Sequence, residues 1–178
     1  MTVWTCVRYL AWLAVLGLVS ACSGHSTRPA PEATAAAPVP ERDLIAEVRA
    51  RAAAADDSIE VQPLLDPVAV DLREAAAMHE RHGDLRAADA ALVQALELVP
   101  DAPELLQWRA ELALAMGRLD DAVQLANASW ELGPRVGNLC RRNWIAIQLA
   151  RELSQLPDAA ALAAAQGERC TAAAPVRM

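Results

Sequence analysis

Apolar residues recur along this chain at intervals of three and four, the spacing that places them on one face of an α-helix. Residues 41–55 contain one such stretch, with Leu44, Ile45 and Val48 on its apolar face. Another begins at Asp66-Pro67, because aspartate is a favoured N-cap and proline fits the first helical position. Later stretches carry the apolar sets Leu105, Leu106 and Leu112; Leu119, Val123 and Ala126; and Trp144, Ile147 and Leu149. Runs rich in Val, Ile and Thr are few, so the pattern predicts an all-α fold.

Part of this pattern occurs twice, at an interval of 34 residues. The matched pairs are Gly83 and Gly117, Leu85 and Leu119, Ala88 and Ala122, and Pro100 and Pro134. The glycines suit a turn that needs positive φ, and the small alanines let two helix backbones approach closely. The prolines end a helix, because proline lacks the backbone N–H. A helix–turn–helix unit cannot bury its apolar face alone, so the period predicts stacked hairpins.

These positions resemble the tetratricopeptide repeat family. In the family frame one repeat covers residues 69–102 and a second covers 103–136, while a third hairpin at 137–170 is degenerate. The chain departs from the family at four large positions: Leu72 and Leu106 replace the usual aromatic residue, and His79 and Ala113 replace the usual tyrosine. The resemblance implies a short α-solenoid of antiparallel helix hairpins over residues 66–171, preceded by a helix and connector at 41–65 and followed by a tail at 172–178.

The resemblance also implies a partner-binding groove on the inner face of the stack. Its predicted residues are Val70, Arg73, Ala77, Glu80, Gln107, Glu111, Leu114, Arg141, Ile145 and Gln148. Arg73 and Arg141 occupy equivalent positions two repeats apart, and Leu114 and Ile145 are apolar where the family leaves space for ligands. Arginine and apolar anchors together are typical of recognition surfaces. The alternative is that Leu114 and Ile145 pack against the chain's own helix at 41–55, lying in the groove.

The N-terminal residues predict an export signal. Residues 1–21 hold an apolar run of eleven, Tyr9–Val19, which is shorter than the roughly 20 residues needed to span a bilayer and suits a signal peptide. Val19-Ser20-Ala21-Cys22 resembles the bacterial lipobox, which implies a lipid, including palmitate-type acylation, on Cys22. By the same resemblance, Ser23 after the cysteine implies sorting to the outer membrane rather than to the inner membrane. The alternative is an ordinary secretory signal or short anchor with Cys22 incidental. Residues 22–40, rich in Ala and Pro, are expected to form an extended tether.

Two cysteines remain in the body of the chain, Cys140 and Cys170, and they flank the last predicted hairpin. At 1.5 Å per residue, about 21 Å of helix separates Cys140 from Ser154, and about 20 Å separates Pro157 from Cys170. The two cysteines therefore return to nearly the same level, in an oxidising compartment if the chain is exported. We predict a disulfide between them, with two unrelated thiols as the alternative.

Charge and motifs limit the chemistry. The 178 residues carry a formal net charge of −7, and all sixteen basic residues are arginine, which argues against nucleic acid and against electrostatic docking on anionic lipid. No nucleophile elbow, phosphate loop or Cys-x-x-Cys is present, so we expect no enzyme, cofactor or small-molecule substrate. His79 and His82 have a spacing that permits metal binding, but the repeat frame gives His79 a packing role, and we predict no metal site.

The combined interpretation is a lipid-anchored adaptor on the periplasmic face of the bacterial outer membrane. It would bind a protein partner of a cell-envelope complex through the predicted groove. The alternative is a structural subunit of an envelope assembly, or a homodimer, in which the repeats are buried.

Overall fold

The computed structural model describes residues 42–54 and 66–171, and all regular elements in these ranges are helical. They are α2 (Leu44–Ala53), α3 (Pro67–Arg81), α4 (Leu85–Leu98), α5 (Pro103–Ala115), α6 (Leu119–Leu132), α7 (Gly137–Leu153), α8 (Pro157–Gly167) and the short 3-10 helix η1 (Glu168–Cys170). The predicted all-α class is therefore confirmed. The expected signal peptide, Cys22, the tether and the tail lie outside the described residues. None of the helices in the described ranges is long and apolar enough to cross a membrane.

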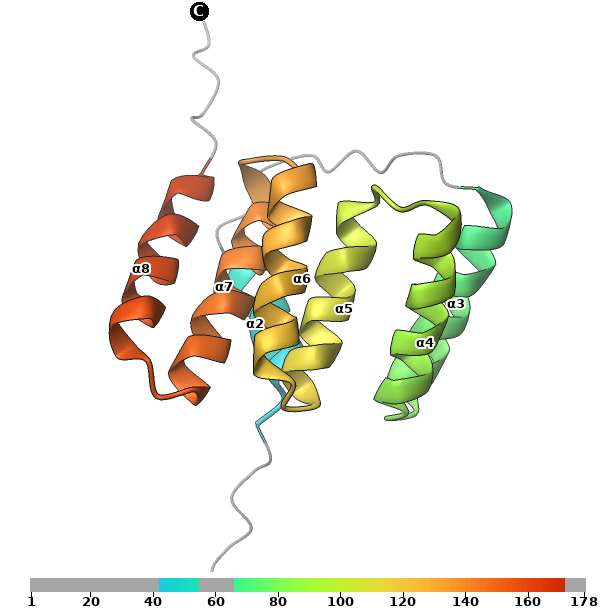
Figure 1. The fold of residues 1–178 in the computed structure, drawn as a ribbon, viewed down its shortest axis with the longest axis horizontal. Coiled ribbons are helices and arrows are strands. Elements are labelled where there is room, and N and C mark those ends of the chain that lie inside the picture. Colours follow the sequence, from blue (N-terminus) through green and yellow to red (C-terminus); the bar gives the residue numbers. More distant parts are fainter. Residues whose placement is uncertain (1–41, 55–65, 172–178) are drawn as a thin grey trace, which may run out of the picture. The chain divides into compact units, whose positions relative to one another are not determined.

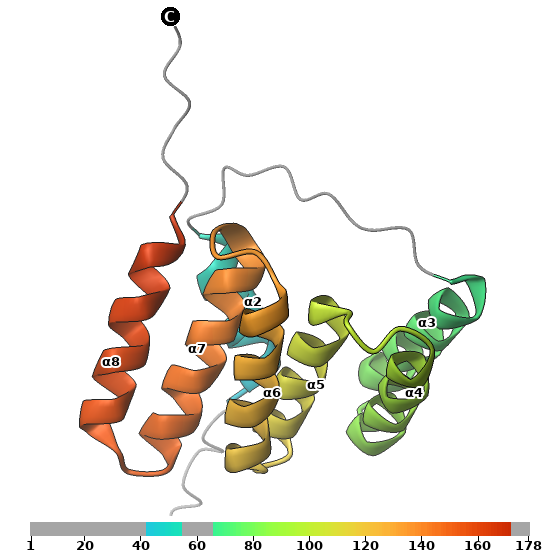
Figure 2. The same cartoon turned by 45° about the horizontal axis from the view of Figure 1, so that its top comes forward.

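Six of the helices form three hairpins that stand side by side in a row (Figure 1). The pairs are α3 with α4, α5 with α6, and α7 with α8, and neighbouring pairs meet where α4 packs on α5 and α6 packs on α7. Figure 2 shows the same order from a second direction. Helix α2 stands apart from this row and packs on α5 and α7. The fold is thus a short solenoid with one additional helix on its inner side.

Helix ends follow the turn chemistry of the sequence. Gly83 and Gly117 have φ values of +77° and +74°, the left-handed conformation that closes the α3–α4 and α5–α6 turns. The Asp66 and Asp84 side chains accept hydrogen bonds from the backbone N–H groups of Val68 and Ala87, so both helices of the first hairpin are capped. Helices α5 to α8 have no side-chain cap of this kind.

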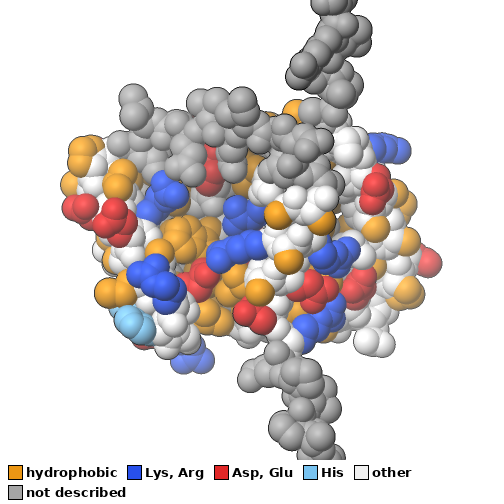
Figure 3. Space-filling view, turned by 180° about the vertical axis from the view of Figure 1, so that it is seen from behind, with side chains coloured by type: hydrophobic (Ala, Val, Ile, Leu, Met, Phe, Trp, Pro, Cys, Tyr) orange, Lys and Arg blue, Asp and Glu red, His pale blue; other side chains and the backbone are white. Residues whose placement is uncertain are grey.

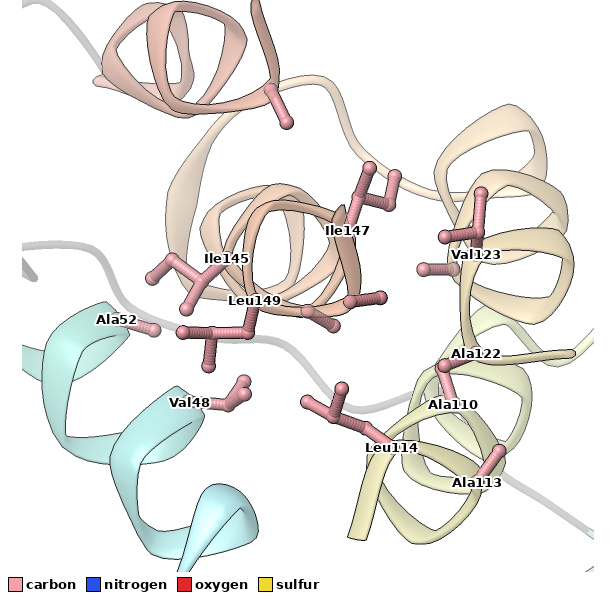
Figure 4. Packing of buried hydrophobic residues seen from close by; sticks show 14 residues of the cluster. Val48, Ala52, Ala110, Ala113, Leu114, Ala122, Val123, Ile145, Ile147 and Leu149 are labelled. Atoms are coloured by element: carbon pink, nitrogen blue, oxygen red, sulfur yellow. The ribbon is translucent and has the colours of Figure 1, made fainter. Parts of the chain in front are cut away.

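The core is built from small and medium-sized aliphatic side chains in two clusters. One joins α4 and α5 around Leu92, Leu105 and Leu112, and Ile45 of α2 belongs to it. The other joins α5, α6 and α7 and includes Val48 and Ala52 of α2 (Figure 4). Many core positions are alanine, including the fully buried Ala88 and Ala122, which lets the helices pack closely. Both clusters therefore include residues of α2, which makes α2 part of the hydrophobic core.

The third hairpin is closed by a disulfide. The sulfur atoms of Cys140 and Cys170 are 1.98 Å apart, and the bond joins the start of α7 to η1. On the same hairpin Trp144 packs edge-to-face on Trp130 of α6, with ring centres 5.3 Å apart. The structure thus links the two cysteines that the sequence places at one level of the hairpin.

Candidate partner-binding groove

The first helices of the three hairpins, α3, α5 and α7, line the inner side of the solenoid, and α2 lies on this surface. Val48 and Ala52 of α2 are fully buried and point towards α5 and α7, where Leu114, Ile145 and Leu149 face them (Figure 4). Leu114 and Ile145 are therefore covered by a helix of the chain itself. For these two residues the structure corresponds to the alternative interpretation of the sequence, and Ile145 also borders a pocket at the C-terminal end of α2.

Arg49 is the polar centre of the contact between α2 and the groove. Its Nη1 and Nη2 atoms donate to Oε1 and Oε2 of Glu80 on α3 at 2.6 and 3.0 Å, a paired geometry that matches guanidinium to carboxylate. Its Nε donates to Oε2 of Glu111 on α5 at 2.9 Å. The guanidinium also lies 5.9 Å from the ring centre of Trp108. One cation of α2 is thus shared between two carboxylates of two different hairpins.

Glu111 is a fully buried carboxylate that needs these partners. Besides Arg49, it accepts hydrogen bonds from Arg142 Nε on α7 at 2.7 Å and from Gln107 Nε2 at 3.3 Å. A buried charge is tolerated only where hydrogen bonds and opposite charges replace the lost water. The groove therefore contains a polar network that crosses α2, α3, α5 and α7.

The electrostatic environment keeps Glu80 ionised. Burial by itself would raise the pKa of the Glu80 carboxyl, but hydrogen bonds from Arg49 and Trp108 and the nearby charges of Arg49 and Arg142 hold it below its ordinary value. Burial also acts to lower the pKa of Arg49, and the carboxylates of Glu80 and Glu111 outweigh this effect and raise it. Both partners consequently stay charged at neutral pH.

Arg141 contacts the C-terminal end of α2. Its Nε donates to the backbone carbonyl oxygen of Ala52 at 3.0 Å, and the contact is buried. A cation at this end of a helix satisfies a free carbonyl group and interacts favourably with the helix dipole. Next to it, Arg51 of α2 donates to Oε1 of Gln148 at 2.8 Å. Two more of the predicted groove residues are therefore engaged by α2.

The predicted groove residues thus divide into two groups. Residues of α5 and α7 contact α2 or the network around it, and Glu80 joins them through Arg49. Arg73 and Ala77 are half-buried on α3, which does not pack its backbone on α2 or α5 within the described residues. Arg73 and Arg141, equivalent in the repeat frame, therefore have different surroundings, because α2 covers only one part of the groove.

Open space remains at both ends of α2. A cleft of about 710 Å³ borders its N-terminal half and the α3–α4 turn, with lining residues that include Arg42, Ile45, Arg49, Glu80, Arg81 and Leu85. A smaller pocket of about 240 Å³ at its C-terminal end is lined by residues that include Arg51, Arg141, Trp144 and Gln148. Figure 3 shows this side of the molecule, where cationic and acidic side chains alternate beside a hollow with a hydrophobic surface.

Sequence reasoning missed Arg49, Trp108 and Arg142 as members of the site. Arg49 directly follows Val48 and so lies at the edge of the apolar face of α2, which is the available signal. Trp108 and Arg142 are absent from the predicted groove residues. The structure instead gives both residues a role in holding Glu80 and Glu111.

Comparison with known proteins supports the repeat architecture. Residues 80–137, from the end of α3 to the start of α7, match the family model described as Tetratricopeptide repeat. Among solved structures, the chain is similar to the globular C-terminal domain of LpoP from P. aeruginosa, at 29% sequence identity and a TM-score of 0.55. This similarity covers 59% of the chain and 99% of the LpoP chain. No curated protein matches the chain.

Proposed function

We propose, from the premise that this chain carries tetratricopeptide repeats, that it is a lipid-anchored adaptor that binds a protein partner of a bacterial cell-envelope complex. The observation that supports this proposal most directly is the inner groove, which already holds a helix through apolar, ionic and backbone contacts. A surface that holds one helix in this way has the chemistry of helix-in-groove recognition. The similarity to the LpoP domain supports the same interpretation.

The anchor in this proposal is a lipid on Cys22, at the periplasmic face of the outer membrane. The supporting feature is the Val19–Cys22 motif after an apolar run, followed by serine. Labelling with a palmitate analogue is expected to mark the wild-type chain and leave Cys22→Ser unlabelled. Recovery of Cys22→Ser in the membrane fraction at the wild-type level would contradict the lipid anchor.

The partner-binding role can be tested by site-specific photo-crosslinking in envelope extract. Val70 lies on α3 with 37% of its surface exposed, beside the part of the inner side that α2 leaves uncovered. A photoreactive residue at Val70 is expected to capture one defined envelope protein. The matched control is the same residue at Leu162, which lies on α8 and is 69% exposed. Capture only from Leu162, or no product with a second protein, would contradict binding through the inner side.

A second candidate is the structural subunit, and the exposed apolar side chains near α8 favour it. Leu153, Leu156 and Leu162 are 41%, 46% and 69% exposed and lie on the last hairpin. If they form a subunit contact, the chain will be a dimer by light scattering, and Leu162→Asp will return it to a monomer. A monomeric wild-type chain at high concentration would exclude self-association through this surface.

A further inference from the structure

We infer that the inner groove is a receptor for an arginine-bearing amphipathic helix of the partner. We also infer that α2 competes with that helix for the same binding surface, called here the seat of α2. This inference rests on the proposed function, and it adds the chemistry of the ligand and a means of regulation. Its basis is the set of contacts that α2 makes, because they show what the groove recognises.

The groove makes three kinds of contact with α2: apolar, ionic and backbone hydrogen-bonding. Apolar surface takes Ile45, Val48 and Ala52, which are spaced at i, i+3 and i+7 along one helix face. The carboxylates of Glu80 and Glu111 take the guanidinium that follows the second apolar residue. Arg141 takes a carbonyl oxygen at the C-terminal end. A competing helix therefore needs two aliphatic residues three positions apart and an arginine directly after the second one. It also needs a small residue four positions after the second aliphatic residue.

Charge in the empty groove favours a cation in particular. If α2 leaves, Arg142 and Gln107 still hydrogen-bond Glu111, and Trp108 still donates to Glu80. Loss of Arg49 removes one positive charge from the network of Glu80, Glu111 and Arg142, so this group of described residues changes from one cation for each carboxylate to one cation for two. A ligand that brings a guanidinium restores the balance, whereas an acidic ligand increases the repulsion.

The seat of α2 is small enough for exchange. Helix α2 has 10 residues, and isolated helices of this length are marginal in water, so its helical state depends on the groove. It buries only three side chains, and the Arg49 side chain keeps 38% of its surface exposed. Elements with few buried contacts open at the lowest free energy in a fold. The open cleft beside Ile45 and Arg49 gives an incoming helix access to Glu80, one of the two carboxylates.

The test uses a fluorescent, blocked peptide with the sequence of residues 42–54 as the probe and the full chain as the receptor. Arg49→Ala in the chain weakens its own α2 and leaves Glu80, Glu111 and Arg141 in place. Because α2 then occupies the groove for a smaller fraction of the time, the peptide is expected to bind at least about tenfold more tightly than to the wild-type chain. A peptide with Glu at the Arg49 position is expected not to bind.

Two further variants make the result interpretable. Ile45→Ala in the chain weakens the same seat without a change of charge and is expected to tighten peptide binding by a smaller factor. Arg86→Ala removes an exposed arginine of α4 and is the matched control, with wild-type binding expected. The inference is overturned if Arg49→Ala and Ile45→Ala keep the wild-type circular dichroism spectrum and bind the peptide no more tightly than the wild type.

The remaining outcomes separate this inference from the proposed function. If the variants form dimers and do not bind the peptide, the occupant of the groove is α2 of a second copy, and the inference is overturned. Capture of an envelope protein from Val70 without peptide binding would overturn the inference and leave the adaptor function standing. Peptide binding without any captured protein would support the receptor and contradict the adaptor function.

Discussion

The first hairpin, α3 with α4, and the third hairpin, α7 with α8, differ in what holds them. The first follows the 34-residue pattern, has aspartate caps on both helices and turns at a glycine with positive φ. The third departs from the pattern and has no side-chain cap, but a disulfide closes it and both α2 and α6 pack on α7. One hairpin is thus specified by its local sequence and the other by its tertiary contacts.

The third hairpin is attached to the rest of the fold more extensively than the first, although its local sequence specifies it less well. The first hairpin joins its neighbours through the packing of α4 on α5, through the Glu80 contacts, and through Asp89, which accepts hydrogen bonds from Arg109 and Arg118 at 2.7 and 2.8 Å. The third hairpin shares a continuous apolar cluster with α2, α5 and α6. A match to the repeat pattern therefore predicts that a hairpin forms, but it does not predict how extensively that hairpin packs on its neighbours.

Removal of the disulfide is expected to have the largest effect. The bond closes a loop with a sequence separation of 30, which the chain-entropy model values at about 3–4 kcal/mol. Cys140→Ser with Cys170→Ser should lower Tm, and reductant should lower it no further in that variant. Hydrogen exchange should rise in α7 and α8 before it rises in α3 and α4. Both thiols alkylated in the native protein without reductant would mean that the bond does not form.

Leu92→Ala is expected to have the next largest effect, on the first hairpin. Leu92 is fully buried in the cluster that joins α4 to α5, and such truncations cost about 3 kcal/mol through lost burial and the cavity left behind. Exchange protection should fall mainly in α3 and α4. The matched control is Leu162→Ala on the exposed face of α8, with little change expected. An equal loss of protection in α7 and α8 would show that the hairpins unfold together.

Asp84→Ala tests the local specification of the first hairpin. The Asp84 carboxylate accepts a hydrogen bond from the N–H of Ala87 at 3.1 Å, and loss of such a cap costs about 1 kcal/mol. Asp158→Ala is the comparison, because Asp158 lies in the first turn of α8 and does not cap it. Chemical denaturation of both variants should give the larger loss for Asp84→Ala. Equal losses would argue against a special role for caps in the first hairpin.

Acidification is expected to have the smallest of these effects, a weaker attachment of the first hairpin to the rest of the fold. The folded-state pKa of Glu80 lies below its ordinary value of about 4.3, so its ionic contacts stabilise the fold fully above that pH. The contribution is lost as pH falls through the lower folded-state value. The difference in Tm between wild type and Glu80→Gln should therefore shrink as the pH falls below about 4.3. A difference that stays constant over this range would mean that Glu80 does not carry the effect.

Local features of the fold could be predicted from the sequence. The glycine turns and the helix-ending prolines are confirmed, because each depends on backbone chemistry within a few residues. The family resemblance, which depends on the 34-residue period, is confirmed as well. The pairing of Cys140 with Cys170 is also accessible, since two helices of similar length must return to the same level. These predictions need no knowledge of how distant segments pack.

The occupant of the groove could not be predicted in the same way. Whether Leu114 and Ile145 are open depends on where α2 lies, and no periodicity relates α2 to the repeats that follow it. The role of Arg49 follows from side chains on α3 and α5 that are 31 and 62 residues away in the chain. Arg73 and Arg141 have the same position in the repeat, yet only Arg141 meets the end of α2.

The position of α2 also decides where a mechanical load enters the fold. The chain reaches the described domain at residue 42, directly before α2, so tension applied from the N-terminal side acts first on this helix. The seat of α2 lies on α5 and α7, in the middle and last hairpins. A pulling force from that side would therefore load the contacts of Arg49, Val48 and Ala52 before those of the first hairpin. Tension from this side would thus act on the helix that covers Leu114 and Ile145 before it acts on the hairpins.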